Sequence, residues 1–164
     1  MDLKRKKIFI AGHKGLVGSS ILKEMKRRNI EPITIEKHEL DLLDQYNVDK
    51  WFRVNKPEMV ILAAARVGGI YANNKYPVQF ILENLKIQTN VIEASFNYKV
   101  EKLLFLGSSC VYPKDSPQPI KEEYLLTSKL EQTNEAYAIA KIAGLKLCQA
   151  YKKQYNCNFF TVMP

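Results

Sequence analysis

The stretch KIFIAGHKGLVGSS, residues 7–20, decides the fold of this chain. A short apolar run ends in glycine, and residues 16–29 then place apolar side chains at helical spacing, with a basic last turn. This pattern predicts a buried strand, a glycine loop and a helix. We expect Gly12 to permit a tight turn, Gly15 to let the backbone approach a pyrophosphate, and Gly18 to let the helix pack closely on the strand.

The rest of the sequence repeats this alternation of apolar runs and helical patterns. We expect strands at residues 7–12, 32–36, 59–65, 102–109 and 158–164, and helices at residues 16–29, 42–57, 77–98 and 134–155. In the second helix, Val48, Trp51 and Phe52 should face inward. Strands that are apolar on both faces and alternate with helices indicate a parallel sheet covered on both sides. The expected fold class is therefore α/β, a Rossmann-like doubly wound parallel sheet with helices on both faces.

Length and composition restrict the class of protein further. The 164 residues, 46% of them hydrophobic, suffice for one domain with a core. The net charge of +8 is spread along the chain, which favours a basic surface or an anionic small ligand over nucleic acid. No apolar run is long enough for a membrane span, and the N-terminus leads straight into a strand, so we expect a cytoplasmic protein. Three scattered cysteines predict neither a disulfide framework nor a metal site.

The last expected strand stops at the end of the chain. In an open parallel sheet, ligands bind outside the carboxyl ends of the strands, and the segment that would cover this crevice is missing. We therefore interpret residues 1–164 as an incomplete NAD(P)-binding Rossmann domain, without a C-terminal substrate domain.

The end of the second expected strand bears on the choice of cofactor. Glu36 stands where an acid would bind the ribose 2′-hydroxyl of NAD. Lys37 follows it, and Lys14 lies in the glycine loop, so two ammonium groups favour a 2′-phosphate. NADPH is the preferred cofactor in this interpretation, and NAD is the alternative.

A candidate catalytic group follows the fourth expected strand. Tyr137 and Lys141 are four residues apart and share one face of a helix. We expect the ammonium to lower the pKa of the phenol, which would make it a usable proton donor to a carbonyl group. The Ser108 hydroxyl can bind the same carbonyl oxygen. Cys110 is either a small buried side chain or an acid or base near the substrate.

Four stretches carry a resemblance to a known family. They are FIAGHKGLVGSS, AAARVGGIYANNKYP, KLLFLGSSCVYPK and TNEAYAIAKIAGLKLC. Over essentially its whole length the chain resembles the GDP-L-fucose synthase family, within the extended short-chain dehydrogenase/reductase superfamily. The resemblance implies an NADPH-dependent enzyme that epimerises C3 and C5 of a GDP-4-keto-6-deoxy sugar and then reduces the C4 ketone. It also implies a homodimer, in which the two long helices could pair with their copies.

The resemblance also assigns residues. Tyr137 would be the proton donor in reduction, assisted by Ser108 and Lys141, and Cys110 would be the acid or base of epimerisation. The cofactor-binding residues would be Gly12, His13, Lys14, Gly15, Leu16, Val17, Gly18, Lys37, Leu106, Gly107 and Lys141. Lys14 and Lys37 stand where the family commonly has arginine, and lysine keeps the charge but loses the bidentate fork. Neither His13 nor His38 matches the histidine that accompanies the family's cysteine.

Three other functions remain possible from the sequence. A related reductase or epimerase could act on another GDP-linked 4-keto sugar, such as a heptose. A non-catalytic dinucleotide-binding domain could keep the fold, although it would not need Ser108, Tyr137 and Lys141 together. A nucleic-acid-binding protein would show salt-dependent DNA binding.

Overall fold

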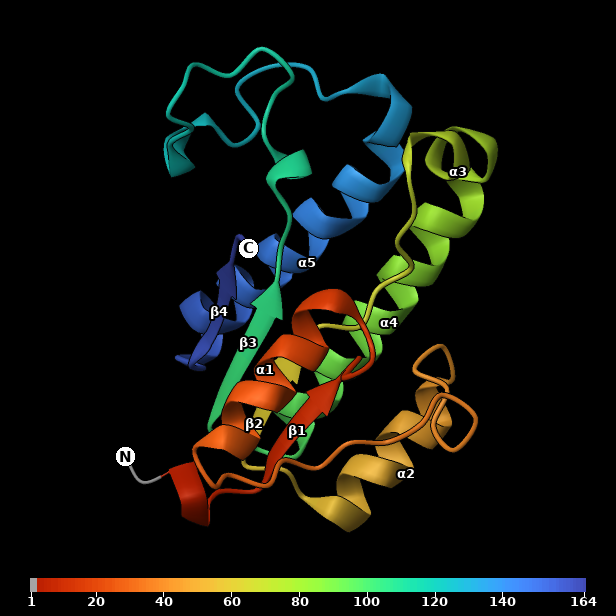
Figure 1. Cartoon of the computed structure of the whole chain (residues 1–164). Helices are drawn as coiled ribbons and strands as arrows, with labels where there is room; N and C mark the ends of the chain where they lie inside the picture. Colours follow the sequence, from red (N-terminus) through yellow and green to blue (C-terminus); the bar gives the residue numbers. More distant parts are fainter. Residues whose placement is uncertain (1–2) are drawn as a thin grey trace.

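The computed structural model describes residues 3–164 and contains one four-stranded parallel sheet (Figure 1). Its strand order is β1-β2-β3-β4, with β1 (Ile8–Ala11), β2 (Met59–Leu62), β3 (Lys102–Leu106) and β4 (Phe159–Val162). The α-helices are α1 (Leu16–Arg27), α2 (Gln45–Asn55), α3 (Ile70–Lys75), α4 (Pro77–Asn97) and α5 (Glu135–Tyr155). Short 3₁₀ helices lie at η1 (Leu3–Arg5), η2 (Ser109–Val111), η3 (Glu122–Tyr124) and η4 (Gln132–Asn134).

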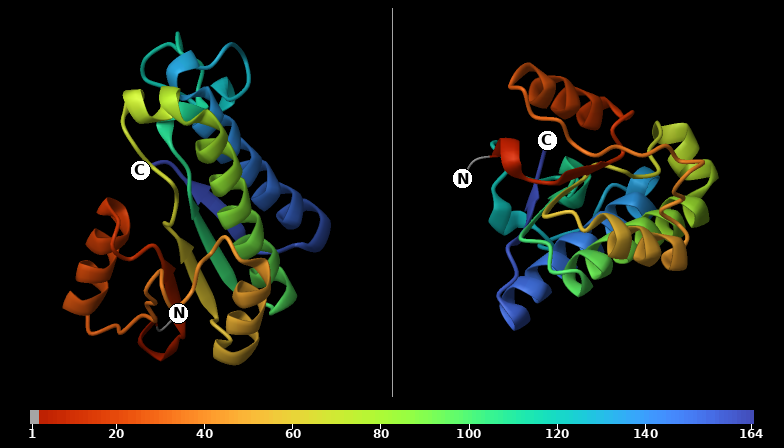
Figure 2. Two further views of the ribbon diagram at one scale, coloured as in Figure 1. Left: turned by 90° about the vertical axis from the view of Figure 1, so that its right-hand side faces the viewer. Right: turned by 90° about the horizontal axis from the view of Figure 1, so that it is seen from below.

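The elements form three layers, which Figure 2 shows with the sheet between its helices. Helix α1 covers one face, and α2, α4 and α5 cover the other. All strand pairs are parallel, so the predicted doubly wound α/β fold is confirmed. Within residues 3–164, no helix is long and apolar enough to cross a membrane.

Alternation along the strands divides the core into two parts. Phe9 lies with Val48 and Phe52 in the larger core, beneath α2, α4 and α5. Ile8 and Ile10 lie in a smaller core, against α1. Successive strand residues point to opposite faces of a sheet, so one apolar run supplies both cores. The inward placement of Val48 and Phe52 is confirmed, and Trp51 packs against the larger core while remaining partly exposed.

The α1 face of the sheet is covered unevenly. One register row crosses the sheet on this face through Ile10, Ile61, Leu104 and Phe160. Ile10 is fully buried, whereas Phe160 is 37% exposed. The neighbouring Phe159 points to the other face and is only 2% exposed. A single helix is too narrow to cover four strands, so α1 shields the β1–β2 half of the sheet.

The expected second strand, residues 32–36, is wrong as an element. Only Ile33 pairs, in an isolated parallel bridge with Phe9. The Ile33 N–H donates to the Ile8 carbonyl at 2.7 Å, and its own carbonyl accepts from the Ile10 N–H at 3.0 Å. The segment lies at the sheet edge, beside β1 alone, and its pairing ends after this one residue.

The bridge at Ile33 nevertheless shows on which side of β1 the chain first returns to the sheet, and this order creates a place where a ligand can bind. The chain leaves β1, pairs at Ile33 on one side of it, and then crosses to β2 on its other side. The carboxyl ends of β1 and β2 therefore border a topological switch point, where open α/β sheets bind their ligands.

The two long helices match their predicted ranges to within one residue and pack on each other. Pro77 starts α4, where its missing N–H costs nothing. The buried Gln88 side chain of α4 donates to the Ala140 carbonyl of α5 at 2.6 Å. At Gly144, an added Cβ would lie 2.6 Å from the Phe105 ring, so α5 approaches β3 closely. Helix α3 lies between the strand expected at residues 59–65 and the helix expected at residues 77–98, and the sequence did not predict it.

Candidate active site

The glycine loop at the end of β1 is shaped by two close approaches. Gly12 has φ +91°, and a Cβ there would lie 2.5 Å from the Ala64 nitrogen, so the loop touches the end of β2. A Cβ on Gly18 would overlap the Gly12 carbonyl oxygen, so α1 starts directly against the loop. Gly15 lies at the N-cap of α1, where a Cβ would meet only the Gly12 oxygen, at an ordinary 3.5 Å.

These approaches leave the start of α1 open to an anion. Among the residues the structure describes, no side chain caps this helix, and its first turn carries no acid. Its first N–H groups and its positive dipole end are therefore available to a phosphate. The start of α1 thus offers backbone donors to an anion, and the diphosphate site that the glycine spacing predicts stays a prediction.

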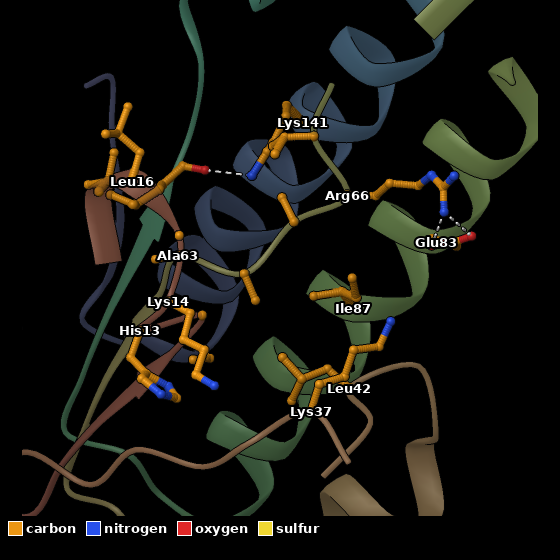
Figure 3. A pocket seen from close by; sticks show the side chains of 18 of the residues that line it. His13, Lys14, Leu16, Lys37, Leu42, Ala63, Arg66, Glu83, Ile87 and Lys141 are labelled. Carbon is orange, nitrogen blue, oxygen red and sulfur yellow. Dashed lines mark hydrogen bonds and ion pairs between the residues drawn. The ribbon is translucent and has the colours of Figure 1, made fainter. Parts of the chain in front are cut away.

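A cavity of about 640 Å³ extends from this loop along the carboxyl ends of β1, β2 and β3. Figure 3 shows Lys141 at one end and His13, Lys14 and Lys37 at the other. The predicted residues that line it are Gly12, His13, Lys14, Gly15, Leu16, Val17, Lys37, Leu106, Gly107, Ser108, Tyr137 and Lys141. Gly18 instead packs α1 on the loop, and Cys110 lies outside the lining. A dinucleotide is of the size that such a cavity holds.

One end of the cavity carries an ion-pair cluster around Glu36. Lys14 Nζ lies 2.6 Å from one carboxylate oxygen, and His13 Nε2 lies 3.6 Å from the other. The pKa of Glu36 is lowered, first by the hydrogen bond from Lys14 and further by the charges of His13 and His38. Of the two lysines that the sequence set against Glu36, Lys14 is therefore paired with it, and Lys37 lines the same end of the cavity.

At the opposite end, Lys141 is a buried ammonium group, only 3% exposed. Its Nζ donates to the Leu106 carbonyl at 2.8 Å and lies 4.6 Å from the centre of the Phe105 ring. Burial lowers its pKa to about 8, because the surrounding apolar groups disfavour the charge. A buried lysine at the carboxyl end of a strand is a marker of a functional site.

Tyr137 lies one helical turn before Lys141, and the two side chains are neighbours. Lys141 Nζ is 5.9 Å from the centre of the Tyr137 ring. The expected lowering of the tyrosine pKa is wrong in this structure: burial raises it, a hydrogen bond with Ser108 opposes the rise, and the charge of Cys110 adds to it. The phenol therefore keeps its proton at neutral pH, as a proton donor must.

Ser108 and Cys110 form a short turn at the end of β3. The Cys110 N–H donates to the Ser108 hydroxyl oxygen at 3.3 Å, which caps η2. The Cys110 sulfur accepts a hydrogen bond from the Asn134 side-chain amide at 3.3 Å. All three cysteines of the chain are free thiols. The predicted group of Ser108, Tyr137 and Lys141 thus converges on one cavity, with Cys110 beside it.

Sequence reasoning missed Arg66, which also lines the cavity. Its side chain pairs with Glu83 at 3.0 Å, and the Asn84 amide binds both the N–H and the carbonyl of the Arg66 backbone. Asn134, the partner of Cys110, was missed as well. Arg66 follows an apolar strand directly, and polar residues at strand ends were the signal that could have identified it.

The glycine turn at the switch point and the cavity beside it place the chain among dinucleotide-binding α/β domains. It belongs to the NAD dependent epimerase/dehydratase family, which it matches over residues 8–164.

Named relatives are similar over nearly the whole chain. A GDP-L-fucose synthase of Sinorhizobium fredii is 57% identical over 99% of this chain and 52% of the relative, and one of Escherichia coli is 49% identical over 99% and 51%. The crystal structure of a GDP-D-glycero-L-gluco-heptose synthase from Campylobacter jejuni in the presence of NADPH has a TM-score of 0.94, with 42% identity over 98% of this chain and 47% of that one. The chain spans about half the length of the curated relatives it matches.

Proposed function

We propose that this chain forms the cofactor-binding and catalytic part of an NADPH-dependent epimerase/reductase that converts GDP-4-keto-6-deoxy-D-mannose to GDP-L-fucose. One observation carries the proposal: Ser108, Tyr137 and Lys141 converge on the cavity that the glycine loop opens. A domain that only binds a dinucleotide needs no proton donor there. The names of the relatives supply the substrate class, a GDP-linked sugar.

In the reduction, the cofactor supplies a hydride to C4 of the keto sugar. Tyr137 gives its phenolic proton to the ketone oxygen, and the Ser108 hydroxyl donates a hydrogen bond to the same oxygen. The raised pKa of Tyr137 keeps that proton in place until charge develops on the oxygen. The ammonium of Lys141, 5.9 Å from the ring, favours the phenolate that remains.

In the epimerisation, Cys110 exchanges protons at C3 and C5. Both carbons neighbour the C4 ketone, so their protons are acidic enough for a positioned base to remove. Cys110 lies two residues from Ser108 on one turn, which places the thiol near the group that binds the ketone oxygen. Inversion at each carbon also requires a second group, an acid that returns a proton to the opposite face, and neither His13 nor His38 is matched to that role.

NADPH is the proposed cofactor because the charged end of the cavity suits a 2′-phosphate. Lys14 and His13 lie around Glu36, and Lys37 adds a further ammonium group. Lys14 offsets the charge of Glu36, which would otherwise repel a phosphate. The heptose synthase from Campylobacter jejuni, crystallised in the presence of NADPH, supports the same choice.

Reduction of a GDP-linked 4-keto heptose is the second candidate, favoured by the TM-score of 0.94 to that heptose synthase. Both reactions would use the same proton donor and cofactor. A panel of GDP-4-keto-6-deoxymannose and GDP-4-keto heptoses, assayed side by side, separates the two.

The experiment joins residues 1–164 to the C-terminal half of the Escherichia coli GDP-L-fucose synthase. We expect the chimera to consume NADPH with GDP-4-keto-6-deoxymannose, and Tyr137→Phe to lower kcat by a factor on the order of 100 or more. NADPH binding, measured by calorimetry, should stay close to wild type because the phenol is not part of the glycine loop. Unchanged turnover of the Tyr137→Phe chimera would refute the proposal.

A second variant of the same chimera separates the two chemical steps. Cys110→Ser should suppress deuterium exchange at C3 and C5 strongly, while reduction of an already epimerised ketone persists. The hydroxyl of serine is a far weaker base than a thiolate, although its size is similar. Equal losses in both steps would count against Cys110 as the base.

We also propose a homodimer in which α4 and α5 pair with their copies. Apolar side chains that remain exposed on these helices support it, among them Val78, Leu82 and Ile139. Light scattering measures the mass of the particle in solution. A monomeric mass at micromolar protein concentration would contradict the proposed pairing of α4 and α5 with their copies.

A further inference from the structure

Asn134 connects the start of α5 to the thiol of Cys110. It is the last residue of η4 and directly precedes α5. Its side chain does not cap the helix, although asparagine at this place usually does. Instead, Nδ2 donates a hydrogen bond to Cys110 Sγ at 3.3 Å. The helix therefore forgoes a common stabilising contact, and the amide is directed at sulfur.

An N–H donor at this distance restricts rotation of the Cys110 side chain. The backbone is fixed separately, by the bond from the Cys110 N–H to the Ser108 hydroxyl. Sulfur and backbone are thus held by different residues.

The other half of the Asn134 amide provides an independent observation. Its Oδ1 is buried and has no hydrogen-bond partner within residues 3–164. Buried acceptors without partners are rare, and they concentrate at sites where a bound group supplies the donor. A hydroxyl of a sugar bound beside Cys110 is a donor of the right kind.

We propose that Asn134 is a positioning residue for the proton-transferring thiol: its amide N–H holds the Cys110 sulfur in place. The inference deepens the proposed epimerase function, on which it rests. Asn134 acts through Cys110, and its effect therefore has to be visible in the reactivity of that thiol.

Other charged or titratable groups surround the thiol and have to be kept constant. Helix α5 brings Tyr137, whose pKa the charge of Cys110 raises, and Lys141. Element η4 is preceded by Glu131, whose carboxylate is paired with Lys114 at 2.9 Å. None of these four side chains is altered in the variants below.

The test uses the chimera described above and compares deuterium exchange at C3 and C5 with reduction of an already epimerised ketone. Asn134→Ala should slow the exchange about threefold to tenfold, because the Cys110 sulfur is then no longer held, and should leave the reduction nearly unchanged. Asn134→Asp should slow the exchange more, since a carboxylate cannot donate a hydrogen bond to the sulfur.

Asn134→Asp also separates positioning from a structural role. Aspartate has the same shape and starts helices as well as asparagine does, so a residue needed only to begin α5 would tolerate it. Asn97→Asp, at an exposed position on α4, controls for the added charge. Deuterium exchange at the wild-type rate in the Asn134→Asp chimera, with an unchanged melting temperature, would overturn the inference. This result would leave the proposed function standing, because the Cys110→Ser chimera tests that function alone.

Discussion

The two ends of the cavity are built in opposite ways. At the ends of β1 and β2, backbone segments contact each other directly because the residues there are glycines: Gly12 touches Ala64, and Gly18 touches Gly12. At the end of β3, the site consists of side chains that come from two distant parts of the sequence, Ser108 from the strand and Tyr137 and Lys141 from α5. The first end is suited to hold a phosphate group, and the second to move a proton.

Because of this difference, we expect separate substitutions to impair cofactor binding and proton transfer. A change in the glycine loop alters the shape of the backbone and should therefore affect both stability and cofactor affinity. A change at the catalytic end leaves the loop intact and should affect turnover or side-chain ionisation. Three substitutions test this separation, in addition to those at Tyr137, Cys110 and Asn134.

The largest effect is expected for Gly18→Ala. The new methyl group would overlap the Gly12 carbonyl, so α1 must move away from the loop. We expect a loss of about 1–3 kcal/mol in the free energy of unfolding and no measurable NADPH binding. Thermal melts and calorimetric titration of the chain measure both.

Gly15→Ala is the matched control. Its Cβ would only touch the Gly12 oxygen at 3.5 Å, so the fold should be nearly as stable as wild type. NADPH binding should still weaken, because the methyl group stands where the backbone has to approach a phosphate. If Gly18→Ala bound NADPH like wild type, close packing of α1 on the loop would not be required for binding.

The next effect has the opposite sign and is expected for Lys141→Met. Burial lowers the pKa of Lys141 to about 8 from 10.5, so between these values the unfolded chain holds more protons and wild-type stability rises with pH. Below pH 8, folding carries the whole cost of the buried charge. Methionine removes that cost, and after the lost bond to the Leu106 carbonyl we expect a gain of about 2 kcal/mol near pH 7.

This gain should shrink as pH rises and disappear above about pH 10.5, where the wild-type lysine is neutral in both states. Urea unfolding at several pH values measures it. Lys146→Met, at an exposed position on the same helix, should change stability little. A Lys141→Met variant that is less stable than wild type near pH 7 would show that the ammonium group stabilises the fold.

The smallest effect is expected for Glu36→Gln. The change removes a carboxylate from the charged end of the cavity and releases Lys14 from its 2.6 Å ion pair. NADPH affinity should then rise severalfold relative to NADH, because a 2′-phosphate meets less repulsion. Lys37→Gln should shift the ratio the other way. A preference for NADH in the unchanged chain would mean that Glu36 governs the ribose site.

Much of the fold follows from local sequence patterns. The glycine loop, the two long helices and four of the five expected strands were predictable because each is a continuous run with its own periodicity and start or stop residues. The segment at residues 32–36 has the same apolar pattern, but it lies at the sheet edge and only Ile33 pairs there. Such a tertiary effect is not visible in a short run.

The candidate site was predictable where the distance between two residues along the sequence is enough to bring their side chains together. Tyr137 and Lys141 share a helix face at any position in a fold, so their proximity followed from the sequence alone. The direction of the Tyr137 pKa shift did not follow, because it depends first on how deeply the folded chain buries the phenol. Asn134 and Arg66 were missed for a related reason, since their partners lie far away in the sequence.

The close approach of α5 to β3 at Gly144 extends the active site beyond the residues that line it. Gly144 lies one turn beyond Lys141, and the position of that helix relative to the strand sets how far Tyr137 stands from Ser108. A methyl group there would push against the Phe105 ring and the Gln88 amide, and would tilt the helix that carries both reacting groups. The alignment of Tyr137 thus depends on the absence of a side chain at Gly144, two helical turns away. A search confined to the residues that line the cavity would overlook this position.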